Sequence, residues 1–157
     1  MNKVYPDAAA ALHDVFDGAR IMSGGFGLCG NAENCIAALA AMPLRDLTVI
    51  SNNCGNAGKG LAILLQQRKV SRVIGSYIGG NPDQQAQYLA GEIEVELTPQ
   101  GTLAERIRAG GAGLGGFFTP TGAGTVVAEG KEERIIDGRR YIFEAPLHAD
   151  FAILRAE

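Results

Sequence analysis

The sequence lacks the features that mark several large classes of protein. It has no excess of positive charge, because 14 Lys and Arg residues are outnumbered by 17 Asp and Glu residues, a formal net charge of −3. A mildly acidic chain without a basic run is a poor ligand for nucleic acid or an anionic membrane surface. No apolar stretch reaches the roughly 18 residues that a membrane-spanning helix needs. We therefore expect neither nucleic acid nor a membrane among its partners.

Cysteine is scarce as well. The count of three is odd, and Cys29, Cys35 and Cys54 lie in apolar sequence, which favours a reducing compartment over a disulfide framework. Together with His13 and His148 they show no metal-ligand spacing, so we expect no metal site. The N-terminus lacks a charged region followed by an apolar run and a cleavage site. These observations predict a cytoplasmic protein. We expect Cys29 and Cys54 to be buried apolar residues rather than nucleophiles, because neither histidine lies in a loop grouped with them.

Glycine, by contrast, is abundant. It accounts for 22 of 157 residues, about twice its usual share of roughly 7%. Such an excess is typical of tight loops in which the backbone approaches a ligand. Apolar residues make up 46% and charged residues 20% of the chain, which excludes disorder for most of it. The length is that of one compact domain.

Short runs rich in β-forming residues alternate with helical stretches along the chain. This alternation predicts an α/β fold with an open, largely parallel sheet flanked by helices. Asn81-Pro82 is typical of a helix start, and the spacing of Thr102 and Glu105 predicts a capping box at the start of another helix. We expect strands over 19–22, 47–50, 73–78, 93–97, 125–128, 141–144 and 151–154. Because the last of these looks like a buried strand, we expect residues 1–157 to form a single domain that is incomplete at its C-terminal end.

Three loops at predicted strand ends could carry chemistry. The segment Gly25–Gly30 fits the pattern G-x-G-x-x-G of dinucleotide-binding proteins, but no acidic residue follows the next strand to hold a ribose. A tight strand-to-helix turn explains these glycines equally well. Asn52 and Asn53 end the second strand and offer neutral amides to a carbonyl or an oxyanion.

The third loop contains Gln100, between Pro99 and Gly101 and just before a helix start. Its amide could point at a developing oxyanion with help from the helix dipole, although a solvent-exposed glutamine in a turn has the same spacing. Arg106 and Arg108 could meet an anionic ligand, or form a solvated face paired with acidic neighbours.

Several segments of the chain closely resemble the A (alpha) subunit of the family I 3-oxoacid CoA-transferases. The resemblance runs over essentially the whole chain, and its longest block is specific to that family. The segments that carry it are 24–30, 51–53, 87–92, 94–113 and 117–122.

The resemblance implies a CoA-transferase-like fold and an enzyme of ketone-body metabolism. Such enzymes move coenzyme A between an acyl-CoA, such as succinyl-CoA or acetyl-CoA, and a 3-oxoacid, such as acetoacetate. Catalysis is covalent and ping-pong, and the nucleophile is a glutamate of a separate B subunit, so the resemblance implies a hetero-oligomer that is active only when assembled. Coenzyme A is a substrate here, and no permanently bound cofactor is implied.

The resemblance also implies roles for particular residues. Gln100 matches the glutamine of the family's oxyanion hole, and Asn52 and Asn53 match its pair of active-site asparagines. The loop assigned to CoA binding matches Gly24, Gly25, Phe26, Gly27, Leu28, Cys29 and Gly30. Two alternatives stay open: a non-catalytic fragment that binds CoA or a partner, and a dinucleotide-binding oxidoreductase.

Overall fold

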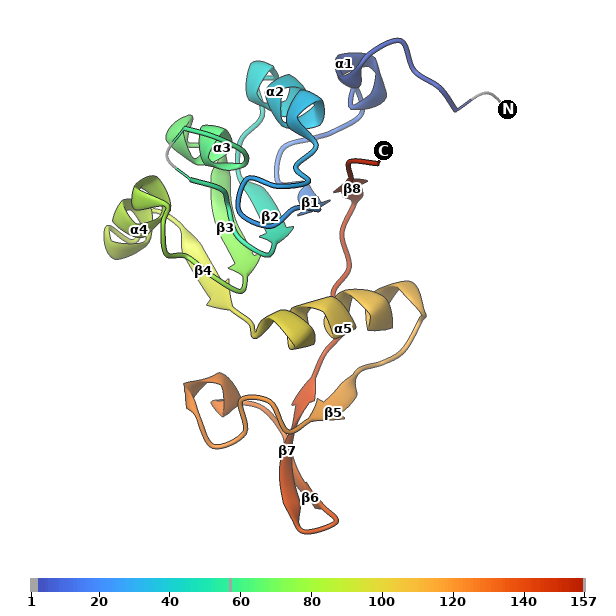
Figure 1. Cartoon of the computed structure of the whole chain (residues 1–157), viewed down its shortest axis with the longest axis vertical. Coiled ribbons are helices and arrows are strands. Elements are labelled where there is room, and N and C mark those ends of the chain that lie inside the picture. Colours follow the sequence, from blue (N-terminus) through green and yellow to red (C-terminus); the bar gives the residue numbers. More distant parts are fainter. Residues whose placement is uncertain (1–2, 57, 157) are drawn as a thin grey trace. The chain divides into compact units, whose positions relative to one another are not determined.

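The computed structural model describes residues 3–56 and 58–156, which divide into two compact units (Figure 1). The first unit comprises Met1–Glu96 and Ala149–Glu157, and the second unit comprises Leu97–His148. The second unit is therefore an insertion in the sequence of the first.

The first unit is built on a five-stranded sheet with the strand order β4-β3-β2-β1-β8. The pairs β1–β2, β2–β3 and β1–β8 are all parallel, which confirms the α/β fold with a largely parallel sheet that the sequence predicts. The strands are β1 (Arg20–Ser23), β2 (Leu47–Ser51), β3 (Val70–Gly75), β4 (Glu94–Leu97) and β8 (Phe151–Ile153).

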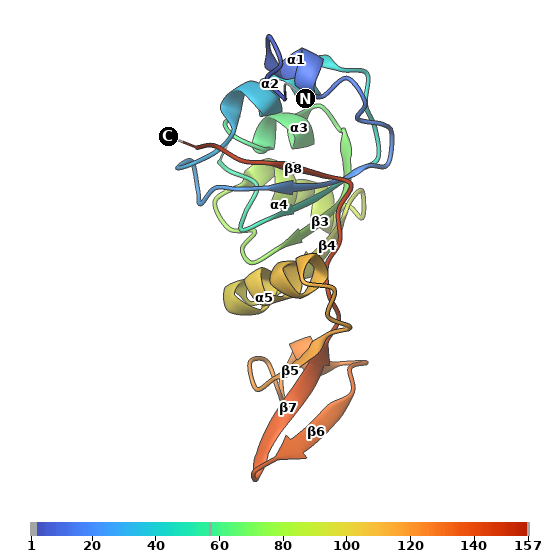
Figure 2. The same cartoon turned by 90° about the vertical axis from the view of Figure 1, so that its right-hand side faces the viewer.

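Four helices accompany this sheet: α1 (Ala8–Ala11), α2 (Glu33–Ala41), α3 (Ala62–Gln66) and α4 (Pro82–Leu89). The first three lie on the same side of the sheet (Figures 1 and 2). Asn81 caps α4 as predicted, because its side-chain oxygen accepts a 3.0 Å hydrogen bond from the backbone N–H of Gln84. Within the described parts of the chain, no helix is long and apolar enough to cross a membrane.

The core of the first unit lies between the sheet and these helices. The register places Ile21, Val49 and Val73 in one row across β1, β2 and β3, and all three side chains are buried. The helices contribute Ile36 and Leu64 to the same cluster. Each buried side chain of this kind contributes about 1.5–3 kcal/mol, so this layer dominates the stability of the first unit.

Strand β8 differs from its prediction as a fully buried strand. It lies at the edge of the sheet, beside β1, and only Ile153 of its residues is buried, while Leu154 after it is 73% exposed. Asp150 fixes the start of the pairing, because its carboxylate accepts a 2.8 Å hydrogen bond from the N–H of Arg20. An edge strand has one unpaired side, which explains its greater exposure.

The second unit combines one helix with a small antiparallel sheet (Figure 2). Its strands have the order β5-β7-β6. The predicted strand at 125–128 is wrong: a 3₁₀ turn forms there instead, and the Thr125 hydroxyl caps it. The elements are α5 (Gln100–Gly111), β5 (Phe117–Thr119), η1 (Val126–Ala128), β6 (Glu133–Ile136) and β7 (Arg139–Glu144).

Strands β5 and β6 are not among the predicted strands. All four residues of β6 are exposed, so the strand lacks the apolar alternation from which strands are predicted. A turn signal was nevertheless present, because Asp137-Gly138 joins β6 to β7 as a two-residue hairpin turn. Both residues have positive φ angles, 48° and 75°, as this tight turn requires.

Candidate active site

The carboxyl ends of three strands in the first unit are tied together by hydrogen bonds. The Ser51 hydroxyl at the end of β2 donates a buried 2.9 Å hydrogen bond to the carbonyl of Ser23 at the end of β1. The next residue, Gly24, donates from its N–H to the carbonyl of Ile153 in β8, at 3.0 Å. Open α/β sheets bind ligands at the carboxyl ends of their strands, so the loops that follow these strand ends form a candidate site.

The first of these loops is the glycine-rich segment 24–30, which we call the glycine loop. Phe26 and Cys29 exchange two 2.9 Å backbone hydrogen bonds, so the loop folds back on itself as a small hairpin. Gly25 has a φ angle of 122°, and a Cβ atom there would collide with the side chain of Asn31. Glycine is therefore required at this position by the turn itself.

Two asparagines hold the tip of the glycine loop. The N–H of Gly27 donates to the Oδ1 atom of Asn53 at 3.2 Å, and the Nδ2 atom of Asn31 donates to the carbonyl of Gly27 at 3.3 Å. Asn52 links the same edge to the loop after β3, because its carbonyl accepts a 2.9 Å hydrogen bond from the N–H of Ser76. The structure thus brings the glycine loop and the Asn52-Asn53 pair together at one place.

The tip of the glycine loop carries exposed apolar side chains. The Phe26 ring is 74% exposed, and Leu28 is exposed as well. Cys29 is exposed too, so the prediction that it is a buried apolar cysteine is wrong. Its place in the hairpin explains the exposure, since residues 26–29 project from the sheet edge.

Cys54 follows the asparagine pair and has the opposite character. It is fully buried, as predicted, and desolvation raises the pKa of its thiol to about 12. A thiol with this pKa is almost entirely protonated at neutral pH, and the thiolate is the reactive form. Cys54 is thus a packing residue and a poor nucleophile.

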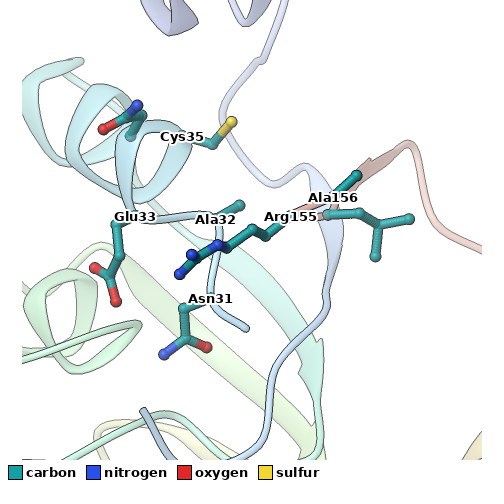
Figure 3. Close-up of a pocket in the computed structure, with 8 residues that line it drawn as sticks. Asn31, Ala32, Glu33, Cys35, Arg155 and Ala156 are labelled. Carbon is teal, nitrogen blue, oxygen red and sulfur yellow. The ribbon is translucent and has the colours of Figure 1, made fainter. Parts of the chain in front are cut away.

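A pocket of about 390 Å³ opens beside the glycine loop, at the start of α2 (Figure 3). Asn31, Glu33 and Cys35 line one side and Arg155 lines the other. In Figure 3 the Arg155 side chain extends from the chain after β8 toward the start of α2. The pocket therefore combines amide, carboxylate and guanidinium groups close to the loop that the resemblance assigns to CoA.

Gln100 belongs to the second unit and is the first residue of α5. It is exposed, and the positive end of the helix dipole lies at its position. The predicted capping box at Thr102 is wrong, because α5 begins two residues earlier, with Pro99 as its N-cap and no side-chain cap. Thr102 lies inside the helix, and its buried hydroxyl has no hydrogen-bond partner among the described residues.

The two arginines of α5 have different surroundings. Arg108 pairs with Glu105 on the exposed face through two hydrogen bonds of 2.6 and 2.8 Å. This pairing lowers the pKa of the Glu105 carboxyl and raises the pKa of Arg108. Arg106 is instead buried against Glu144, a contact that could not be expected from the sequence because 38 residues separate the two.

The geometry disfavours the dinucleotide interpretation of the glycine loop. The dinucleotide pattern also requires an acidic residue after the second strand, to bind the ribose. Ser51–Asn53 at the end of β2 includes no carboxylate for a ribose. Among residues 3–56 and 58–156, no group of three or more His, Cys, Asp and Glu side chains is arranged to hold a metal ion.

Comparison with known proteins identifies the family of the chain. Residues 5–157 match the family model described as Coenzyme A transferase. The chain is 54% identical over 155 residues to the A subunit of the succinyl-CoA:3-ketoacid coenzyme A transferase of Xanthomonas campestris pv. campestris (strain B100), a match that covers 98% of this chain and 64% of that protein. It is 49% identical over 156 residues to the A subunit of the probable succinyl-CoA:3-ketoacid coenzyme A transferase of Bacillus subtilis (strain 168), covering 99% and 66%.

A solved structure shares the fold. The crystal structure of an acyl-CoA transferase from E. coli O157:H7, in a thioester complex with CoA, matches with a TM-score of 0.81 at 24% identity and covers 96% of this chain and 34% of that one. The chain spans 64% and 66% of the length of the two curated relatives. The family-model match, the relatives and the shared fold lead to one conclusion: the chain belongs to the coenzyme A transferase family.

Proposed function

We propose that the chain is the A-type component of a CoA-transferase that moves coenzyme A between an acyl-CoA and a 3-oxoacid. Succinyl-CoA and acetoacetate are the substrates that the names of the curated relatives favour. The chain's partner in this proposal is a B subunit, in a hetero-oligomer, that supplies the glutamate nucleophile. Residues 1–157 then belong to one CoA-transferase domain.

The observation that carries this proposal is the hydrogen bond between Gly27 and Asn53. It joins two loops to which the family resemblance assigns one site, although 26 residues separate them in the sequence. The bond also uses the Oδ1 atom of Asn53, so the Nδ2 group of that side chain is oriented by the loop. An oriented amide donor is what a developing oxyanion needs.

The proposed reaction has two covalent stages. The glutamate carboxylate supplied by the partner attacks the acyl-CoA carbonyl and expels CoA thiolate, which leaves an acyl-glutamyl anhydride. The thiolate then attacks the glutamyl carbonyl of this anhydride, which releases the first acid and leaves a glutamyl-CoA thioester. The second acid reverses the sequence and departs as its own CoA ester.

Each of these attacks passes through a tetrahedral oxyanion. We assign Gln100 as a donor to this oxyanion, because its exposed position at the start of α5 adds the helix dipole to its amide hydrogen bond. In the first unit, Asn52 and Asn53 offer amide groups of the same kind at the carboxyl end of β2. The glycine loop, Gly24–Gly30, contacts coenzyme A through its backbone and the exposed Phe26 and Leu28 side chains, and coenzyme A comes and goes as a substrate.

The test is Gln100→Ala in the enzyme assembled with its B subunit. Removal of one oxyanion donor lowers kcat by about 10²–10³-fold, and we expect a loss of this size with little change in KM. The matched control is Gln67→Ala, which removes an exposed glutamine at the end of α3. Steady-state rates of acetoacetyl-CoA formation from succinyl-CoA measure both variants.

The same assay separates the alternatives. If the wild-type chain binds CoA and its partner but never restores turnover, it is a binding fragment and the transferase proposal fails. If Gln100→Ala keeps the wild-type kcat, the oxyanion role of Gln100 is wrong even though the enzyme is a transferase.

A further inference from the structure

The second unit contains a buried charge cluster that the proposed reaction does not use. Arg106 and Glu144 are the only charged residues that are buried among the described residues, with side chains 10% and 2% exposed. Lys131 joins them, because its ammonium group lies 2.6 Å from the Glu144 carboxylate. Buried charges are costly unless they are paired and hydrogen-bonded, so this cluster needs a structural explanation.

Arg106 binds two separate segments of the second unit. Its Nε atom donates a 2.8 Å hydrogen bond to the carbonyl of Ala145 and lies 3.8 Å from the Glu144 carboxylate. Its Nη1 atom donates to the Thr98 hydroxyl at 3.3 Å, a contact buried from solvent. Its own carbonyl accepts a 2.9 Å hydrogen bond from the N–H of Leu147. The residue therefore ties α5 both to the segment after β7 and to the segment that precedes α5.

The contact with Thr98 is the one that bears on Gln100. Thr98 is buried and lies two residues before Gln100, with only Pro99 between them. Pro99, the N-cap of α5, has no N–H and makes no side-chain capping bond, so the usual means of fixing a first helical turn is absent. The guanidinium of Arg106 reaches back along the helix and supplies a fixed point at Thr98 instead.

The bond between Arg106 and Thr98 acts beside the backbone hydrogen bonds of α5. The first of these backbone bonds is donated by the N–H of Leu103 to the carbonyl of Pro99, at 2.8 Å. The Glu144 carboxylate lies 3.8 Å from the Nε atom of the guanidinium and 2.6 Å from the Lys131 ammonium group, so it balances part of the charge of both cations. A planar guanidinium can hold Thr98 and Ala145 at once, which a lysine at this position could not do.

We infer that Arg106 and Thr98 are positioning residues, which fix the backbone around Gln100 through the hydrogen bond between them. This inference rests on the proposed role of Gln100. A displacement of about 1 Å at a catalytic group can cost up to about 10²-fold in rate, so the loss of this bond should lower kcat without altering the binding of substrates.

The test uses Thr98→Val, which removes the hydroxyl and keeps the shape of the side chain. In the assembled enzyme we expect kcat to fall at least about tenfold while KM changes less than about twofold. Thr98→Ser, which keeps the hydroxyl, should restore most of the rate. Thr48→Val makes the same change within β2 of the first unit and serves as the matched control.

A double variant separates positioning from general destabilisation. If Thr98 acts through Gln100, Thr98→Val should have little further effect on kcat once Gln100 has been replaced by alanine. If Thr98→Val lowers kcat by the same factor in the wild-type enzyme and in the Gln100→Ala enzyme, the inference is wrong. The inference is also wrong if Gln100→Ala lowers kcat but Thr98→Val does not. That result would leave the proposed function intact.

A second measurement does not depend on activity. Amide hydrogen exchange of the chain reports on the Leu103 N–H, which closes the first turn of α5. We expect Thr98→Val to raise its exchange rate about tenfold and to leave amides of β2 unchanged. If Leu103 exchanges at the wild-type rate in this variant, the hydrogen bond does not hold the turn and the inference is wrong.

Discussion

The two units of the molecule are stabilised in different ways. The first unit buries one continuous apolar cluster that extends from its helices to three neighbouring strands. The second unit buries fewer apolar side chains, and it also contains the cluster of Arg106, Glu144 and Lys131. Its buried apolar residues are Leu103, Ala109, Ala128, Ile142 and Leu147. Apolar burial tolerates small shifts, whereas paired charges require defined geometry. The unit that contains Gln100 is the one built on directional contacts.

The largest effect is expected in the apolar core of the first unit. Leu64 is fully buried in α3, so Leu64→Ala removes three carbon atoms from a packed site and leaves a cavity. We expect the free energy of unfolding of this unit to fall by about 3–5 kcal/mol. Native-state hydrogen exchange of amides in β2 and β3 measures it. The control is Leu89→Ala at an exposed site in α4, and an equal loss there would contradict the comparison.

A smaller effect is expected in the charge cluster of the second unit. Glu144→Gln leaves Arg106 and Lys131 without their carboxylate, and a buried pair that loses one partner costs about 3–5 kcal/mol. Because Lys131 remains 30% exposed and can turn to solvent, we expect about 2–3 kcal/mol. Exchange of amides in β7 measures the change.

The control for this prediction is Glu133→Gln, which alters an exposed ion pair between Glu133 on β6 and Arg140 on β7. Such surface pairs contribute about 0–1 kcal/mol. If Glu144→Gln and Glu133→Gln lower the free energy of unfolding by the same amount, the buried cluster contributes no more than a surface ion pair. The second unit would then not depend on its charged groups for stability.

The smallest effect has the opposite sign. Gln84 in α4 is fully buried, and neither end of its carboxamide has a hydrogen-bond partner among the described residues. An unsatisfied buried polar group costs about 1–3 kcal/mol, so Gln84→Leu should stabilise the first unit by about 1–2 kcal/mol. Urea denaturation measures the free energy of unfolding of this variant. The control is Gln85→Leu, at the exposed neighbouring position. A loss of stability in Gln84→Leu would mean that the amide is bonded in solution.

The sequence could predict the first unit more fully than the second for a physical reason. The parallel strand at 47–51 is a run of mostly apolar and β-branched residues, and Asn81-Pro82 marks a helix start by local chemistry alone. The exposed strand β6 carries no such pattern, and the pairing of Phe117–Thr119 with β7 depends on residues far along the chain. A sequence pattern therefore predicts β2 and the start of α4, which neighbouring residues determine, and misses β5 and β6, which form only through pairing with β7.

The candidate site follows the same rule. The glycine loop and the asparagine pair could be found because glycine and asparagine at strand ends are local signals. The bond from Gly27 to Asn53 and the buried pairing of Arg106 with Glu144 could not, because each joins residues that only the folded chain brings together. The exposure of Cys29 was mispredicted since an apolar sequence neighbourhood does not reveal a hairpin that projects from the sheet.

The place of the second unit in the chain has a consequence for folding. Strand β8 pairs with β1, and the hydrogen bond between Arg20 and Asp150 joins residues 130 positions apart in the sequence. Closing so long a loop is entropically costly and slow. The Arg106 side chain donates hydrogen bonds to both Thr98 and Ala145. These two residues lie near the two ends of the insertion. Once the insertion has folded, the chain between β4 and β8 behaves as a short connection, which lowers the entropic cost of pairing β8 with β1.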